Sequence, residues 1–221
     1  MMFTRMSMFF EYEMGNPAAI AALGREHQEH RTAWRPGSYF NHEIIPQSAL
    51  YFAGITTREE YHHQRDTWLK VEASREPLVF KSKQWDTAYA RPIRDQQDAR
   101  EALAVLPEYL PLTSSAARAL ETDEAIGRAY LLVGDLENAE RYLRRATRSC
   151  AALDNPFEHT WALLNYGKLL EQKGDVGGAC NLYRQVVQRW SEGTTSQAAH
   201  ARMTSLKCQV SPAKGPDASK H

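Results

Sequence analysis

Two stretches in the second half of the chain share one spacing of small, apolar and polar positions. GRAYLLVGDLENAERYL, starting at Gly127, aligns with GKLLEQKGDVGGACNLY, starting at Gly167, at an offset of 40 residues. In both stretches apolar residues recur at the spacing of one helix face, and a Gly-Asp pair interrupts them. Repeats of about this length are typical of stacked helical hairpins. The pattern predicts an all-α fold with two clear helix–turn–helix units, at about 120–150 and 160–190.

The spacing within each unit has a physical reason. Gly127 and Ala139 are small because the two helices of a hairpin cross closely there. Gly134 ends the first helix, since glycine adopts the left-handed conformation common at helix C-termini. Asp135 can then cap the second helix, and Leu143 lies four residues after the alanine on the same face. The corresponding residues of the second unit are Gly167, Gly174, Asp175, Ala179 and Tyr183.

This order of small, aromatic, glycine, alanine and large apolar positions resembles the tetratricopeptide repeat (TPR) consensus. The matching residues are Gly127, Tyr130, Gly134, Ala139, Leu143 and Ala146, then Gly167, Gly174, Ala179 and Tyr183. Leu170 and Val186 are looser substitutes, and Asp123 and Leu163 stand in place of the consensus early tryptophan. The resemblance implies a TPR-like stack of antiparallel helical hairpins, an α-solenoid.

Helical patterns also flank the two clear units. Upstream helices are expected at 3–14, 18–30, 42–53, 57–73 and 96–106, and a C-terminal capping helix at 196–208. Thr57 and Glu60 have the spacing of a capping box. We therefore expect degenerate N-terminal hairpins in 1–83, a TPR-like region in 84–208 and a disordered tail in 209–221.

Three segments also resemble the C-terminal TPR region of myxobacterial serine/threonine protein kinases. They are EALAVLPEYLPL, GRAYLLVGDLENAERYLRRATRSCAALDNPFEHT and GDVGGACNLYRQVVQRW, within roughly Trp85–Cys208. The sequence contains no Gly-rich phosphate loop, VAIK-type lysine, HRD or DFG. Phosphoryl transfer needs a metal-holding aspartate and a base. We therefore expect no enzyme activity, no catalytic residue and no cofactor.

Charge and hydropathy narrow the classes of partner. Lys and Arg number 27, and Asp and Glu also number 27, so the formal net charge is zero. A dedicated nucleic-acid binder needs a basic surplus, so no nucleic acid is expected. No stretch approaches the roughly 18 apolar residues of a membrane span, and the N-terminus lacks a signal-peptide pattern. We expect a cytoplasmic protein with a protein or peptide partner.

Histidines and cysteines are the candidates for metal chemistry. His27 and His30 lie one helical turn apart, and His62 and His63 are adjacent. A zinc site needs three or four ligands, and the general-base glutamate of HExxH is absent. Solvated helix surface is therefore the simpler interpretation, with no metal site. A metal-dependent enzyme that uses these histidines is the third hypothesis for function.

The three cysteines, Cys150, Cys180 and Cys208, are odd in number and form no CxxC pair. A disulfide scaffold is therefore not expected. Cysteine is a good small core residue, and we interpret all three in this way. The alternative is a metal or redox site formed with His159.

The resemblance also implies a binding groove, because the first helix of each TPR hairpin lines a concave surface that holds peptides. The residues at those positions are Arg128, Leu131, Leu132, Trp161, Leu164, Asn165, Lys168 and Glu171. Asn165 lies where carboxylate-clamping members carry asparagine, but Glu124 and Arg128 replace its companions. Trp161 is the expected anchor, since tryptophan is enriched at binding hot spots; its alternative is packing against Phe157.

These expectations lead to two main hypotheses for function. The first is a non-catalytic TPR-type interaction module, a scaffold or adaptor that binds a partner segment in the groove. The alternative is a regulatory or sensory segment related to a bacterial serine/threonine kinase, without kinase activity of its own. In that case the segment would act in cis or on a separate signalling kinase as its partner.

Overall fold

The computed structural model describes residues 2–30, 44–73, 84–109 and 116–208 of the 221-residue chain. Within these ranges the chain forms α-helices and short π- and 3-10-helical segments, with no strand. The all-α prediction is confirmed. The expected disordered tail, 209–221, lies outside the described residues.

The helices of the first half begin and end close to the predicted ranges. They are α1 (Met2–Glu13), α2 (Pro17–His30), α3 (Ile44–Phe52), α4 (Arg58–Ala73) and α6 (Gln96–Val105). A π-helical segment, η2 (Asp86–Ala90), precedes α6 and a 3-10 segment, η3 (Leu106–Tyr109), follows it; neither was predicted. The predicted capping box forms, since the Thr57 N–H donates to Glu60 (3.0 Å) and the Glu60 N–H donates to Thr57 (3.2 Å).

The second half consists of two tight helix pairs and a final helix. These elements are α7 (Ala116–Val133), α8 (Leu136–Thr147), η4 (Cys150–Ala152), α9 (Pro156–Gln172), α10 (Val176–Arg189) and α11 (Thr194–Ser205). Gly134 ends α7 with φ +86° and Gly174 follows α9 with φ +81°. Asp135 and Asp175 then accept backbone N–H bonds of 3.1 and 2.8 Å in the first turns of α8 and α10.

Glycines mark the points where the two helices of each pair approach most closely. A Cβ atom on Gly127 would lie 2.6 Å from the Leu143 side chain, and one on Gly167 would lie 2.5 Å from the Tyr183 ring. Both distances are shorter than real Cβ contacts. The pairs α7–α8 and α9–α10 therefore pack at a spacing that only glycine permits.

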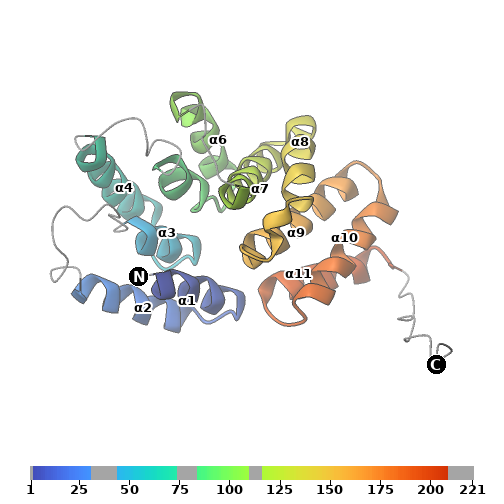
Figure 1. Ribbon diagram of the computed structural model, residues 1–221, viewed down its shortest axis with the longest axis horizontal. Helices are drawn as coiled ribbons and strands as arrows, with labels where there is room; N and C mark the ends of the chain where they lie inside the picture. Colours follow the sequence, from blue (N-terminus) through green and yellow to red (C-terminus); the bar gives the residue numbers. More distant parts are fainter. Residues whose placement is uncertain (1, 31–43, 74–83, 110–115, 209–221) are drawn as a thin grey trace.

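The helices follow one another along an arc that brings α11 back beside α1 (Figure 1). The core is a series of small clusters between neighbouring helices. Leu131, Leu143 and Leu169 pack together between α7, α8 and α9, whereas Met8 and Leu50 belong to a cluster between α1, α2 and α3. Each helix thus relies mainly on its sequence neighbours, and the contact between α1 and α11 joins distant parts of the chain.

A disulfide joins Cys180 in α10 to Cys208, which follows α11, with Cα atoms 5.6 Å apart. The interpretation as a core residue is confirmed for Cys180, which is buried, and it is wrong for Cys150, which is exposed with a free thiol. The disulfide itself was not expected. The two bonded positions are 28 residues apart in sequence. They come together only because α11 folds back on α10, which cysteine spacing alone does not reveal. The bond fixes the end of α11 to the preceding helix.

Replacing Gly127 with alanine tests the close approach of α7 and α8. We expect the free energy of unfolding, measured by urea denaturation, to fall by about 1–3 kcal/mol, because the new methyl group must displace Leu143. Gly177→Ala in α10 is the matched control, because its Cβ would meet only the Asp175 side chain, at 3.9 Å. Alanine also favours the helix at this position, so the urea midpoint of Gly177→Ala should stay the same or rise. Equal midpoints for both variants would contradict the packing.

Candidate functional site

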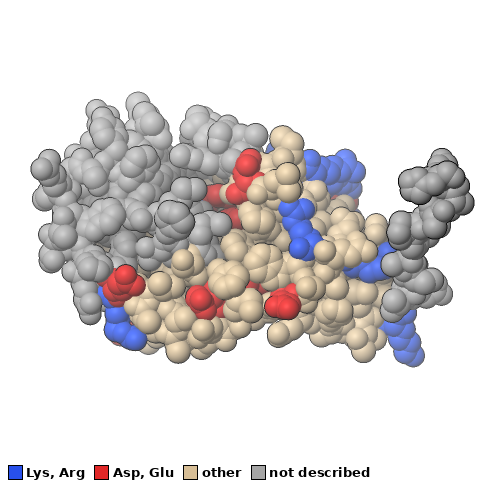
Figure 2. Space-filling model, turned by 60° about the horizontal axis from the view of Figure 1, so that its bottom comes forward, with Lys and Arg blue, Asp and Glu red and all other residues tan. Residues whose placement is uncertain are grey.

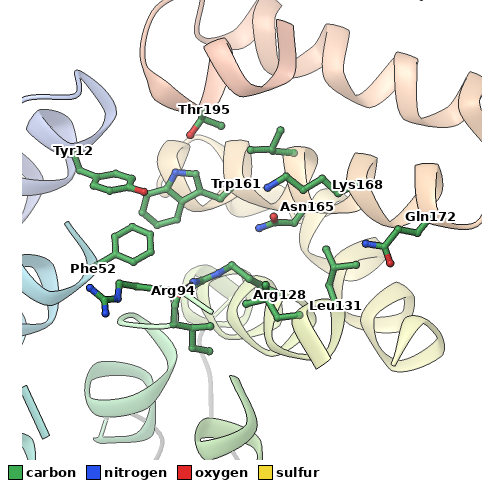
Figure 3. A pocket seen from close by; sticks show the side chains of 13 residues that line it. Tyr12, Phe52, Arg94, Arg128, Leu131, Trp161, Asn165, Lys168, Gln172 and Thr195 are labelled. Atoms are coloured by element: carbon green, nitrogen blue, oxygen red, sulfur yellow. Dashed lines mark hydrogen bonds between the residues drawn. The ribbon is translucent and has the colours of Figure 1, made fainter. Parts of the chain in front are cut away.

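A concave pocket of about 460 Å³ lies where α7 and α9 face α1, α3 and the start of α11 (Figure 3). Its volume is within the range of ligand sites. Helices α7 and α9 line it with Arg128, Leu131, Leu132, Trp161, Leu164, Asn165, Lys168 and Gln172. The remaining lining residues are Tyr12 in α1, Phe52 in α3, Ile93 and Arg94 before α6, and Thr195 in α11.

The pocket brings together the predicted groove residues of α7 and α9, with one exception. Glu171 lies outside it, because its carboxylate pairs with Arg202 of α11 and accepts a hydrogen bond from the Tyr183 hydroxyl (3.0 Å). Helix geometry explains the correction. Eleven residues complete about three turns, so Gln172 and not Glu171 shares the face of Trp161.

Trp161 lies at one end of the pocket among aromatic rings from the N-terminal half of the chain. Its ring centroid is 6.5 Å from that of Tyr12 and 6.0 Å from that of Phe52. The alternative partner, Phe157, instead packs against Trp190 at 5.2 Å. The sequence prediction missed Tyr12 and Phe52, because nothing in local periodicity indicates that α1 and α3 reach α9.

The carboxylate of Glu13 fixes this aromatic end in place. It accepts hydrogen bonds from the Trp161 indole N–H (2.6 Å), the Thr195 hydroxyl (2.6 Å) and the Thr195 backbone N–H (3.1 Å). Glu13 is only 3% exposed, and a buried carboxylate is costly unless such donors satisfy it. A Cβ on Gly193 would lie 2.8 Å from the Glu13 carbonyl oxygen, so the end of α1 also meets the α10–α11 turn at close range.

A second buried carboxylate, Glu124, supports the floor of the pocket. Arg128 donates to it from Nε (3.0 Å), and Asn165 donates to it from Nδ2 (3.0 Å). The Arg128 guanidinium also donates to the carbonyl oxygens of Ile93 (2.5 Å) and Ala90 (3.1 Å). This network joins α7, α9 and the segment between η2 and α6. It leaves the Arg128 charge compensated, and each of the three guanidinium nitrogens donates at least one hydrogen bond.

Lys168 differs from the arginines of the pocket. Arg94 lies over the Tyr51 ring at 3.7 Å and 4.0 Å from Asp98. Among the residues that the structure describes, Lys168 has no hydrogen bond and no ion pair. Burial lowers its pKa, and the nearby charges of Arg128 and Arg202 lower it further, while Glu124 acts in the opposite direction. The pocket therefore holds a partly buried cation without a counter-ion among the described side chains.

Metal ligands do not gather in the described parts of the chain, where no group of three or more His, Cys, Asp or Glu side chains could hold an ion. His62 pairs with Glu101 at 3.2 Å, and His159 Nε2 lies 3.3 Å from the Thr147 carbonyl oxygen. The side chains of His27 and His30 lie outside the described set. No helix in the described ranges is both long enough and apolar enough to cross a membrane.

The chain was compared with protein-family models, curated proteins and solved structures, and none of the three comparisons found a match.

Removing the Glu13 carboxylate should loosen the contact between α1 and α11. For Glu13→Ala we expect a free energy of unfolding lower by about 1–3 kcal/mol, because three donors lose their acceptor. The amide of Thr195 should also exchange with deuterium faster. Glu11→Ala is the control on the same helix, since among the described residues Glu11 bonds only to the exposed Asn16, and it should change stability by no more than about 0.5 kcal/mol. Slow exchange at Thr195 in Glu13→Ala would contradict this account.

Lys168→Met should stabilise the protein near neutral pH. The lowered pKa means that the folded state disfavours the ammonium more than the unfolded chain does. This penalty is complete below the folded-state pKa and disappears as pH rises toward the unfolded value of 10.5. The gain in the urea midpoint should therefore shrink in alkali. Lys173→Met is the control, because Lys173 pairs with Glu140 and its loss should not stabilise.

Proposed function

We propose that this chain is a non-catalytic, TPR-like interaction module that holds an extended segment of a partner protein in the concave pocket. The observation that carries the proposal is the shape of the lining along α9. Trp161, Leu164, Lys168 and Gln172 follow one face of this helix. Their span of 11 residues corresponds to about 16 Å, which an extended chain covers with about five residues.

The chemistry of the lining supports binding without catalysis. The pocket residues include no Asp, Glu, His or Cys, the side chains that most often act as acids, bases or nucleophiles. Aromatic and aliphatic side chains with a few placed polar groups are instead typical of recognition sites. The close glycine crossings in α7–α8 and α9–α10 support the TPR-like part of the proposal.

We place the module in the cytoplasm. The reducing environment there does not favour the disulfide that the structure shows between Cys180 and Cys208, so this bond argues against the placement. Neither cysteine lines the pocket, so the proposed binding does not require the disulfide. The bond would instead affect how firmly α11 is held on α10.

Selection of random peptides tests the proposal. Peptides of about twelve residues are long enough to exceed the pocket, and those enriched on the immobilised protein are synthesised for measurement of Kd. Leu132→Trp, which places a larger ring in the pocket lining, should weaken binding at least roughly tenfold, equal to about 1.4 kcal/mol. Leu153→Trp is the control, because Leu153 is 87% exposed and outside the pocket. Equal affinities for both folded variants would show that the peptides bind elsewhere.

A further inference from the structure

The pocket lining carries positive charge without negative charge. Arg94, Arg128 and Lys168 contribute to it, and no carboxylate does. The outer surface is different: on the face in Figure 2, acidic and basic side chains are both present, and neither covers a broad continuous area of the described residues. The cations of the lining predict an anionic group on whatever occupies the pocket.

Internal contacts show which cation is left for that anion. The Arg128 guanidinium is held by Glu124 and two carbonyl oxygens. Arg94 stacks on Tyr51 and donates to its carbonyl oxygen (2.9 Å). Lys168 has no hydrogen bond and no ion pair among the described residues. The neighbouring acid, Glu171, is already paired with Arg202, so Lys168 is the cation available to a ligand.

Aromatic rings occupy the opposite end of the pocket and give the ligand a direction. Figure 3 shows Tyr12, Phe52 and Trp161 together at one end, with Lys168 further along α9. Lys168 is seven residues after Trp161 in the same helix, a rise of about 10 Å. Three residues of an extended chain cover this distance. An apolar side chain against Trp161 and an anionic one at Lys168 would thus be about three positions apart.

We propose that the pocket recognises an acidic peptide segment, with an Asp or Glu side chain at Lys168 and an aromatic or large apolar side chain about three positions away against Trp161. The inference rests on the proposed function and names the chemistry of the partner. A side-chain carboxylate, and not a chain end, is assigned because the lining continues past Lys168 to Gln172. A segment that filled the pocket would therefore continue beyond its contact with Lys168.

Peptide selection on charge variants tests this assignment. Random peptides are joined to a carrier protein at both ends, so that they present carboxylates only on side chains. Those enriched on the unaltered chain should carry Asp or Glu about three positions from an aromatic or large apolar residue. On Lys168→Glu, Lys or Arg should take the place of the acid. Lys173→Glu reverses a nearby charge outside the pocket, and it should leave the acid in place.

A double-mutant cycle then measures the pairing. Changing the acid of a synthetic peptide to its amide should weaken binding at least roughly tenfold to the unaltered protein. The same change should have almost no effect on binding to Lys168→Met, because the two groups act on each other. Circular dichroism checks that the variant is folded. A change that weakens binding equally to both proteins would overturn the assignment of Lys168.

The remaining outcomes separate the two proposals. If Leu132→Trp prevents binding of the selected peptides but these peptides show no preference for Asp or Glu, the proposal of an acidic segment is overturned. The proposed function then remains intact. A second library presents the peptides with free ends. If binding requires an acid only as the free C-terminal carboxylate of these peptides, the assignment of a side-chain carboxylate is overturned. If neither library yields a binding peptide, the proposed function fails and this inference fails with it.

Discussion

The ion pair between the buried Glu124 and the partly buried Arg128 organises the floor of the pocket. Removing one member of such a pair would leave an uncompensated charge, at a cost of about 3–5 kcal/mol. The pair also uses its remaining hydrogen-bonding groups on Asn165 of α9 and on the backbone before α6. The floor of the pocket is therefore organised before any ligand arrives. Because the Arg128 charge is paired with Glu124, Lys168 is left as the cation without an ion-pair partner among the described residues.

Lys168 illustrates a conflict between stability and binding. A partly buried ammonium without a counter-ion destabilises the folded state, and nothing in the packing of α9 requires a lysine at this position. Proteins commonly tolerate such strain at sites that serve binding. A carboxylate from a partner would relieve it, so the ligand would stabilise the fold as well as occupy the pocket. Rigid aromatic rings at the other end would add apolar contact with little loss of side-chain freedom.

Local sequence patterns predicted most of the helices and the two Gly-Asp turns, because each depends on residues within a few turns of one another. The resemblance to the TPR consensus predicted most of the α9 residues that line the pocket. The same patterns could not predict the aromatic end of the pocket. Tyr12 and Phe52 reach Trp161 only through the path of the whole arc, and the Cys180–Cys208 bond depends on how α11 folds back. Glu171 was assigned to the wrong face by transfer from a repeat consensus, although the angular spacing along α9 favours Gln172.

The contact of Glu13 with Thr195 spans 182 residues, and this separation has a consequence for synthesis on the ribosome. Contacts between distant residues incur the largest loss of chain entropy and form late in folding. A nascent chain whose residue 195 is still inside the ribosome has already released α1, α3 and α7. It lacks the contact that holds the aromatic rings around Trp161. The pocket therefore stays incomplete during translation until α11 has emerged.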